Sequence, residues 1–143
     1  MILNKQSGWS ALAGTTDFGV VSQKAEEGDE MARLAFDTFL DRLVGFVGSY
    51  YVKLKGKVDA LVFAGGIGEH GVQLRRAVVE KVKCLGFELD EDANGKPGEG
   101  VVVDVGKKRD GHRVLICQTD EQTEMARQCA QKAEELRRPH ESK

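Results

Sequence analysis

Hydrophobic residues recur with helical spacing through the second quarter of the chain. The positions that follow the i, i+3, i+4 rule are Met31, Leu34, Ala35, Thr38, Phe39, Leu43, Phe46 and Val47. Asp29 stands where an N-cap is expected, and Gly56 stands where a left-handed C-cap is expected. The pattern predicts one amphipathic helix of about 25 residues that ends near Gly56.

Residues 58–63, VDALVF, form a short apolar run that is rich in β-forming residues. A run of this kind predicts a strand covered on both faces, which indicates an α/β sheet. Two further strands are expected at 101–105 and 113–117, and a weak one at 87–90. The connection between the last two strands is too short for a crossover helix, so the sheet does not follow a regular parallel repeat.

The remaining segments predict shorter helices and loops. Residues 1–28 are rich in Gly, Ser and Thr and are expected to form turns, with a short helix around 9–12. A helix is expected from Val72 to about residue 84, and a polar loop over 91–100. In the last helix, Thr119 and Gln122 have capping-box spacing, which makes Thr119 the expected N-cap. Residues 137–143 are expected to be a frayed polar tail, and residues 1–143 a single unit.

Charge and composition exclude several classes of function. The 143 residues include 21 Lys+Arg and 23 Asp+Glu, for a formal charge of −2. This balance leaves no basic surplus, so we expect no nucleic-acid partner. No apolar run is long enough to cross a membrane, and the first residues lack the pattern of a signal peptide, so we expect no membrane partner.

The three cysteines, Cys84, Cys117 and Cys129, are odd in number and have no CxxC spacing. Each lies in an apolar stretch, which predicts buried thiols in a reducing compartment, so we expect a cytoplasmic protein. No histidine or second cysteine lies at ligand spacing, which argues against a metal site built on thiols.

A glycine-rich segment, AGGIGEHG at 64–71, directly follows the first strand. Glycines let a backbone approach a phosphate or a sugar closely, and no Walker A lysine follows them. Gly66, Gly68 and Gly71 satisfy G-x-G-x-x-G, with Asp90 further along as the acid of a dinucleotide fingerprint. Two alternatives remain at this point: a dinucleotide-binding oxidoreductase unit, or a tight strand-to-helix connection without a ligand.

Two acidic residues lie at positions where ligands are often bound. Asp17 follows Thr15 and Thr16 in a turn, where it is either an Asx-turn or cap, or an acceptor for a ribose hydroxyl or a metal-bound water. Glu121 is expected in the first turn of a helix that follows an apolar strand. It is either a residue favoured by the helix dipole or a carboxylate that holds Mg²⁺ directly or through water.

Several segments together resemble the C-terminal part of acetate kinases. The matching stretches are NKQSG at 4–8, GTTD at 14–17, GDE at 28–30, VDALVF with the following GGIGE at 58–69, and TDE at 119–121. Their order and spacing agree along almost the whole chain. The strand with its GGIGE segment is the most specific of these motifs.

The resemblance implies an α/β fold, namely a partial RNase-H-like C-terminal lobe of the actin-like ATPase superfamily, with a mixed sheet and flanking helices. It further implies ATP/ADP and Mg²⁺ as cofactors. The implied nucleotide-binding residues are Asp17, Phe18, Gly19, Gly65, Gly66, Ile67, Gly68, Glu69 and His70, and the implied metal-associated residue is Glu121.

The implied reaction is reversible phosphoryl transfer from ATP to acetate, giving ADP and acetyl phosphate, in a homodimer. Two positions depart from the family pattern: Gly19 replaces an expected arginine and His70 an expected asparagine. Both bear on the adenosine pocket, so the phosphoryl donor stays open among ATP, other nucleotides and pyrophosphate.

The resemblance covers only the lobe that holds the nucleoside. The segments that would carry the catalytic groups belong to a missing N-terminal lobe, so we expect the chain to be inactive alone. The alternative is a non-catalytic remnant that dimerises or binds nucleotide.

Overall fold

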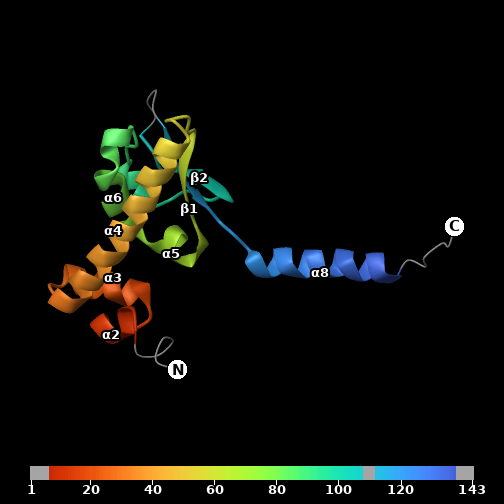
Figure 1. Ribbon diagram of the computed structural model, residues 1–143, viewed down its shortest axis with the longest axis horizontal. Coiled ribbons are helices and arrows are strands. Elements are labelled where there is room, and N and C mark those ends of the chain that lie inside the picture. Colours follow the sequence, from red (N-terminus) through yellow and green to blue (C-terminus); the bar gives the residue numbers. More distant parts are fainter. Residues whose placement is uncertain (1–6, 108–111, 138–143) are drawn as a thin grey trace.

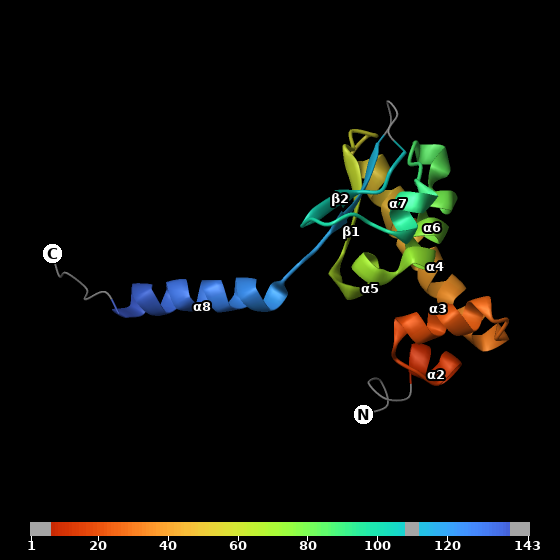
Figure 2. The same ribbon diagram turned by 180° about the vertical axis from the view of Figure 1, so that it is seen from behind.

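The computed structural model describes residues 7–107 and 112–137. A small mixed sheet carries helices on one face, and the last helix extends away from this body (Figures 1 and 2). In chain order the described elements are α2 (Trp9–Ala13), α3 (Phe18–Glu26), α4 (Glu30–Lys53), β1 (Ala60–Ala64), α5 (Gly65–His70), α6 (Val72–Lys81), a 3₁₀ turn (Lys83–Leu85), α7 (Glu91–Gly95), β2 (Val102–Asp104), β3 (Arg113–Cys117) and α8 (Glu121–Arg137).

The sheet has the strand order β1-β3-β2. β1 pairs parallel with β3, in a register that sets Ala60 opposite Arg113 and Ala64 opposite Cys117. β2 pairs antiparallel with β3, as the short connection between them requires. The parallel pairing brings the carboxyl ends of β1 and β3 to the same edge, and both α5 and the lead into α8 begin there.

One face of the sheet packs against the helices. Phe63, Val114 and Ile116 are buried on this face, together with Leu74 and Val78 of α6. Side chains on the opposite face are open, since Val62 is 51% exposed and Val102 is 55% exposed. The prediction that β1 is covered on both faces is therefore wrong for the described residues, whose helices α4, α6 and α7 all lie on one side (Figure 2).

The long helix predicted from periodicity is confirmed as α4. Asp29 caps it by accepting a hydrogen bond from the Ala32 N–H at 2.8 Å. The chain leaves the helix through two left-handed residues, Lys55 and Gly56, with φ of 56° and 71°.

Helix α3 lies in a segment that the sequence predicts to form turns. Asp17 caps α3, and Phe18, Val21 and Ala25 are buried at the spacing of one helical face.

Two other segments also differ from expectation. The glycine-rich segment forms the short helix α5 rather than an open turn, and the predicted loop at 91–100 contains α7.

The predicted weak strand at 87–90 is reduced to two isolated bridges. Phe87 pairs with His112, and Leu89 pairs with Gly106. The predicted capping box at the last helix is also wrong. Asp120, not Thr119, accepts the Thr123 N–H at 2.9 Å and the Thr123 hydroxyl at 2.6 Å.

The cysteines differ from expectation as well. Cys84 and Cys129 are exposed and Cys117 is half-buried, so the prediction of three buried thiols is wrong. The 138–143 part of the expected frayed tail, and the 4–6 part of the NKQSG stretch, lie outside the described residues. Across the part of the chain that is described, no helix is both long and apolar enough to cross a bilayer.

Candidate functional site

The glycines of α5 lie where β1 ends, and they differ in what surrounds them. A Cβ placed on Gly65 or Gly66 would meet no other atom within 4 Å, and Gly65 has a φ of 69°. A Cβ on Gly68 would lie 3.2 Å from the Phe63 backbone, and one on Gly71 would lie 2.5 Å from the Ile67 carbonyl oxygen. The first pair therefore presents open backbone, whereas Gly68 and Gly71 allow α5 to pack closely.

Glu69 connects α5 to the segment that leads into α8. Its Oε1 accepts hydrogen bonds from the Thr119 backbone N–H at 3.0 Å and from the Thr119 hydroxyl at 3.1 Å. These donors favour the ionised carboxylate, and the Thr119 backbone bond is the largest cause of the lowered pKa of Glu69. The neighbouring His70 is exposed.

Glu121 lies in the first turn of α8, two residues after Thr119, and it is exposed. It therefore stands at the same edge of the sheet as α5. Among residues 7–107 and 112–137, no three His, Cys, Asp or Glu side chains form a group that could hold a metal ion.

The expected site residues at the start of α3 are partly structural. One Asp17 oxygen accepts hydrogen bonds from the Gly19 N–H at 2.8 Å and the Val20 N–H at 3.3 Å. The Phe18 side chain is 5% exposed, and its ring packs between Trp9 and Phe39 at centroid distances of 5.0 and 5.1 Å. The Phe18 ring therefore belongs to the core, whereas Asp17 and Gly19 are exposed.

The expected residues thus form two groups. The α5 residues, Thr119 and Glu121 lie along one sheet edge, while Asp17 and Gly19 stand at the start of α3. No hydrogen bond between described residues joins these two groups. A cleft of about 700 Å³ opens between α3, α4 and α6, but none of the residues expected to bind nucleotide or metal lines it.

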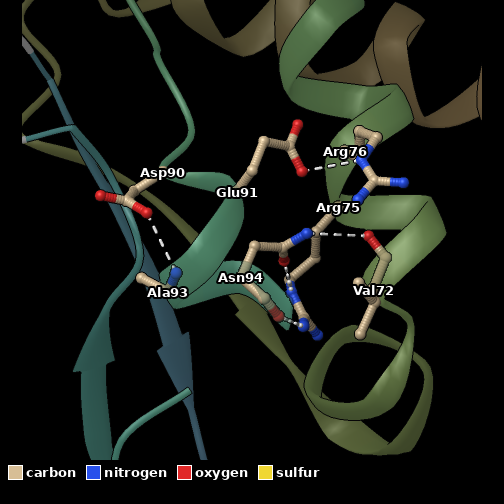
Figure 3. Close-up of polar contacts among 7 residues, drawn as sticks. All are labelled: Val72, Arg75, Arg76, Asp90, Glu91, Ala93 and Asn94. Atoms are coloured by element: carbon tan, nitrogen blue, oxygen red, sulfur yellow. Dashed lines mark hydrogen bonds and ion pairs between the residues drawn. The ribbon is translucent and has the colours of Figure 1, made fainter. Parts of the chain in front are cut away.

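Two buried polar residues beside α5 were not predicted. Arg75 of α6 and Asn94 of α7 are both 0% exposed (Figure 3). The Arg75 guanidinium donates to the carbonyls of Gly68 and Glu69, each at 2.8 Å, and to Asn94. The helical pattern predicts for Arg75 the ordinary role of a helical arginine, on a solvated face or in an ion pair, so its burial had no signal in the sequence.

Asp90, the acid of the dinucleotide alternative, has a structural role. Its Oδ1 accepts the Ala93 N–H at 3.0 Å and caps α7. The segment before it forms only an isolated bridge and not a strand. The dinucleotide interpretation therefore lacks the strand-end acid that it requires.

Comparison with known proteins shows which family the chain belongs to. The family model described as the acetokinase family matches residues 1–127. The chain belongs to the acetokinase family. Relatives include a probable acetate kinase of Chaetomium globosum, which is 48% identical over 93% of this chain and 37% of its own length. A probable acetate kinase of Emericella nidulans is 51% identical over 90% of this chain and 31% of its own length.

Solved structures give the same result for this acetokinase-family chain. The acetate kinase of Entamoeba histolytica superposes with a TM-score of 0.80 and 27% identity, over 91% of this chain and 35% of that one. A propionate kinase of Francisella tularensis superposes with a TM-score of 0.73 and 38% identity, over 84% of this chain and 30% of that one. The expected fold is confirmed. The chain spans about a third of the length of the curated relatives that it matches.

Proposed function

We propose that this acetokinase-family chain supplies the nucleoside-binding part of a phosphotransferase that exchanges a phosphoryl group between ATP and acetate. The supporting observation is the open backbone of Gly65 and Gly66 at the carboxyl end of a parallel strand pair. Ligands of open α/β sheets bind outside this end of the strands, and a glycine without neighbours within 4 Å leaves room for a ligand. Asp17 and Gly19 would complete the pocket from α3, with Ile67, Gly68, Glu69 and His70 beside them.

Mg²⁺ would reach this site with the nucleotide. A protein usually holds Mg²⁺ through one or two carboxylates, while phosphate oxygens and waters fill the other positions. Glu121 fits that limited requirement, because it is exposed and stands at the edge from which α5 begins. A preformed cage of protein ligands is not needed for this role.

We further propose that these 143 residues bind Mg-ATP without transferring its phosphoryl group. Phosphoryl transfer depends on cations placed around the transferring phosphate. Arg75, the arginine nearest in sequence to α5, is buried against backbone carbonyls. Arg76 is committed to an ion pair with Glu91 at 2.8 Å. Acetate and acetyl phosphate would then be substrates of the whole protein.

A homodimer and a cytoplasmic location belong to the same proposal. Several large apolar residues of α4 are exposed on the isolated chain, and a second copy could cover them. These are Met31, Leu34, Phe46, Tyr50 and Val52.

Equilibrium binding tests the proposed function directly. We would titrate the chain with Mg-ATP, Mg-ADP, pyrophosphate and NADH, and we expect Mg-ATP to be preferred to NADH. Gly66→Ala should weaken binding of Mg-ATP, because its methyl group would fill the open backbone. Gly45→Ala is the matched control, since Gly45 is also helical with no neighbour within 4 Å.

Two results would contradict the proposal. Preferential binding of NADH would favour the dinucleotide alternative, and formation of acetyl phosphate by the chain alone would show that it carries the transfer groups. A chain that dimerises but binds none of these ligands would be the non-catalytic remnant. Adding the segment that corresponds to the first two thirds of a relative should restore acetyl phosphate formation if the chain is one part of the enzyme.

A further inference from the structure

The buried Arg75 side chain holds the end of α5. Its Nη1 donates to the carbonyl oxygens of both Gly68 and Glu69 at 2.8 Å. The last carbonyls of a helix have no partner within the helix, and α5 is only 6 residues long. A charged donor at this position satisfies two of them at once.

The other side of the guanidinium is held by α7. Arg75 Nε donates to Asn94 Oδ1 at 2.7 Å, and Arg75 Nη2 donates to the Asn94 backbone carbonyl at 3.0 Å. Asn94 in turn donates from Nδ2 to the Val72 carbonyl at 3.2 Å, at the start of α6. Figure 3 shows the Asn94 amide lying between Arg75 and Val72.

Packing alone does not explain a charged residue at this position. No ion pair with a carboxylate balances Arg75 in the described chain, because every partner of its guanidinium is a carbonyl or amide oxygen. Burial without a counterion disfavours the charged form, and it lowers the pKa of Arg75. An apolar residue would fill the volume without this cost, so the hydrogen-bond geometry is what the arginine adds.

We propose that Arg75 and Asn94 are positioning residues that fix the Gly68–Glu69 end of α5 and thereby set the affinity of the nucleoside site from α7, an element outside it. The chain of contacts runs from the α7 backbone through the guanidinium to the two α5 carbonyls. These contacts hold Glu69 in the position from which it accepts the hydrogen bonds of Thr119. They also fix the orientation of Gly65 and Gly66. The identity of the ligand in this inference rests on the proposed function, whereas the contacts of Arg75 are independent of it.

The test uses the full chain and three variants. Arg75→Lys keeps the charge, but a single ammonium cannot span both α5 and Asn94. The double variant Arg75→Met with Asn94→Leu removes the charge and both polar side chains and fills their volume with apolar groups, while the Gly68 and Glu69 carbonyls lose their donor. Arg76→Lys is the matched control, because Arg76 also joins α6 to α7, through Glu91 at the surface.

Three quantities are measured for each protein: the melting temperature, the hydrogen exchange of the peptide that covers residues 65–70, and the dissociation constant for Mg-ATP. Arg76→Lys should leave all three unchanged. Arg75→Lys should speed exchange in 65–70 and weaken binding of Mg-ATP by about tenfold, the effect of losing one hydrogen bond to a charged group. The double variant should melt at a higher temperature than Arg75→Lys, because it holds no buried charge, while exchange stays fast and binding stays weak.

The outcomes separate a positioning role from a structural one. A double variant that recovers both stability and wild-type Mg-ATP affinity would overturn the inference. If the double variant does not fold, Asn94→Asp replaces it, because the carboxylate keeps the acceptors for Arg75 and loses only the donor to Val72. Exchange in 65–70 of that variant that is slower than in Arg75→Lys supports the proposal, and exchange in Arg75→Lys as slow as in the wild type overturns it. Failure of the wild-type chain to bind Mg-ATP would refute the proposed function, while the exchange measurements would still decide the positioning role.

Discussion

Glu69 accepts two hydrogen bonds from Thr119, one from its backbone N–H and one from its hydroxyl. The two residues are 50 positions apart in the sequence. Their contact ties the end of α5, which is expected to bind nucleotide, to the segment that precedes Glu121. The geometry of the expected metal-associated residue therefore depends on the glycine-rich segment.

The contact between Glu69 and Thr119 should titrate in acid. The pKa of Glu69 lies below its ordinary value of 4.5 in the folded chain. A lowered folded pKa means that the contact is fully present above pH 4.5 and is lost as the pH falls through the folded pKa. We expect the NMR signal of the Thr119 amide proton to shift with a midpoint below pH 4.5.

Glu69→Gln is the variant for this titration. It should abolish the acid-dependent shift at Thr119 while leaving an acceptor in place. The Thr123 amide provides an internal control, because it reports on Asp120, whose pKa is also lowered by its bonds to Thr123. An unchanged Thr119 titration in Glu69→Gln would show that another group causes it.

Asp17 should separate stability from ligand binding. Asp17→Ala removes the cap of α3 and should lower the free energy of unfolding by about 1 kcal/mol, measured by urea denaturation. Asp17→Asn retains an acceptor and should keep most of that stability. If the carboxylate also accepts a ribose hydroxyl, Asp17→Asn will weaken Mg-ATP binding at nearly constant stability. If the loss of Mg-ATP affinity follows the loss of stability in both Asp17→Ala and Asp17→Asn, then Asp17 has only the capping role.

The two classes of glycine around α5 should respond differently to alanine. Gly71→Ala should lower the free energy of unfolding by about 1–3 kcal/mol, because its methyl group would overlap the Ile67 carbonyl oxygen. Gly66→Ala should raise it by about 0.5–1 kcal/mol, since alanine is favoured over glycine within a helix and nothing lies near its methyl group. Urea denaturation of the pair checks this. A large destabilisation by Gly66→Ala would mean that its backbone serves the fold and not a ligand.

The thiols should react in the order of their exposure. Cys84 and Cys129 are exposed and should react quickly with a disulfide reagent such as DTNB in the folded chain, while half-buried Cys117 reacts slowly. In Cys84→Ser with Cys129→Ser, the fast phase should disappear and the slow phase should remain. Reaction of all three thiols only after addition of urea would contradict their described exposure.

The elements with strong periodicity could be predicted from the sequence. Helix α4 has a long apolar stripe with a cap at Asp29, and β1 and β3 are short runs of β-forming residues, so local pattern and tertiary packing agree there. Helix α3 was missed because Gly19 and several polar residues obscure its buried face of Phe18, Val21 and Ala25. The Gly, Ser and Thr content of this segment predicts turns, and the apolar spacing of α3 is too short to indicate a helix until α4 packs against it.

The supporting contacts of the candidate site could not be predicted in the same way. The glycines of α5 are close together in sequence, so they give a local signal. Arg75 and Asn94 meet only after α6 and α7 fold against each other, and neither carries a local signal of burial. Thr119 has capping-box spacing, but Asp120 is the residue that caps α8. Thr119 instead donates to Glu69, which is distant in sequence.

The pairing of β1 with β3 has a consequence for synthesis of the protein on the ribosome. In the described sheet β1 has β3 as its hydrogen-bonded neighbour, and β3 follows β1 and β2 along the described chain. A nascent chain that has not reached Cys117 therefore carries an apolar β1 with an unsatisfied edge, which is a target for chaperones or proteases. Messages that stop before this strand should yield rapidly degraded polypeptides and not a partly working lobe.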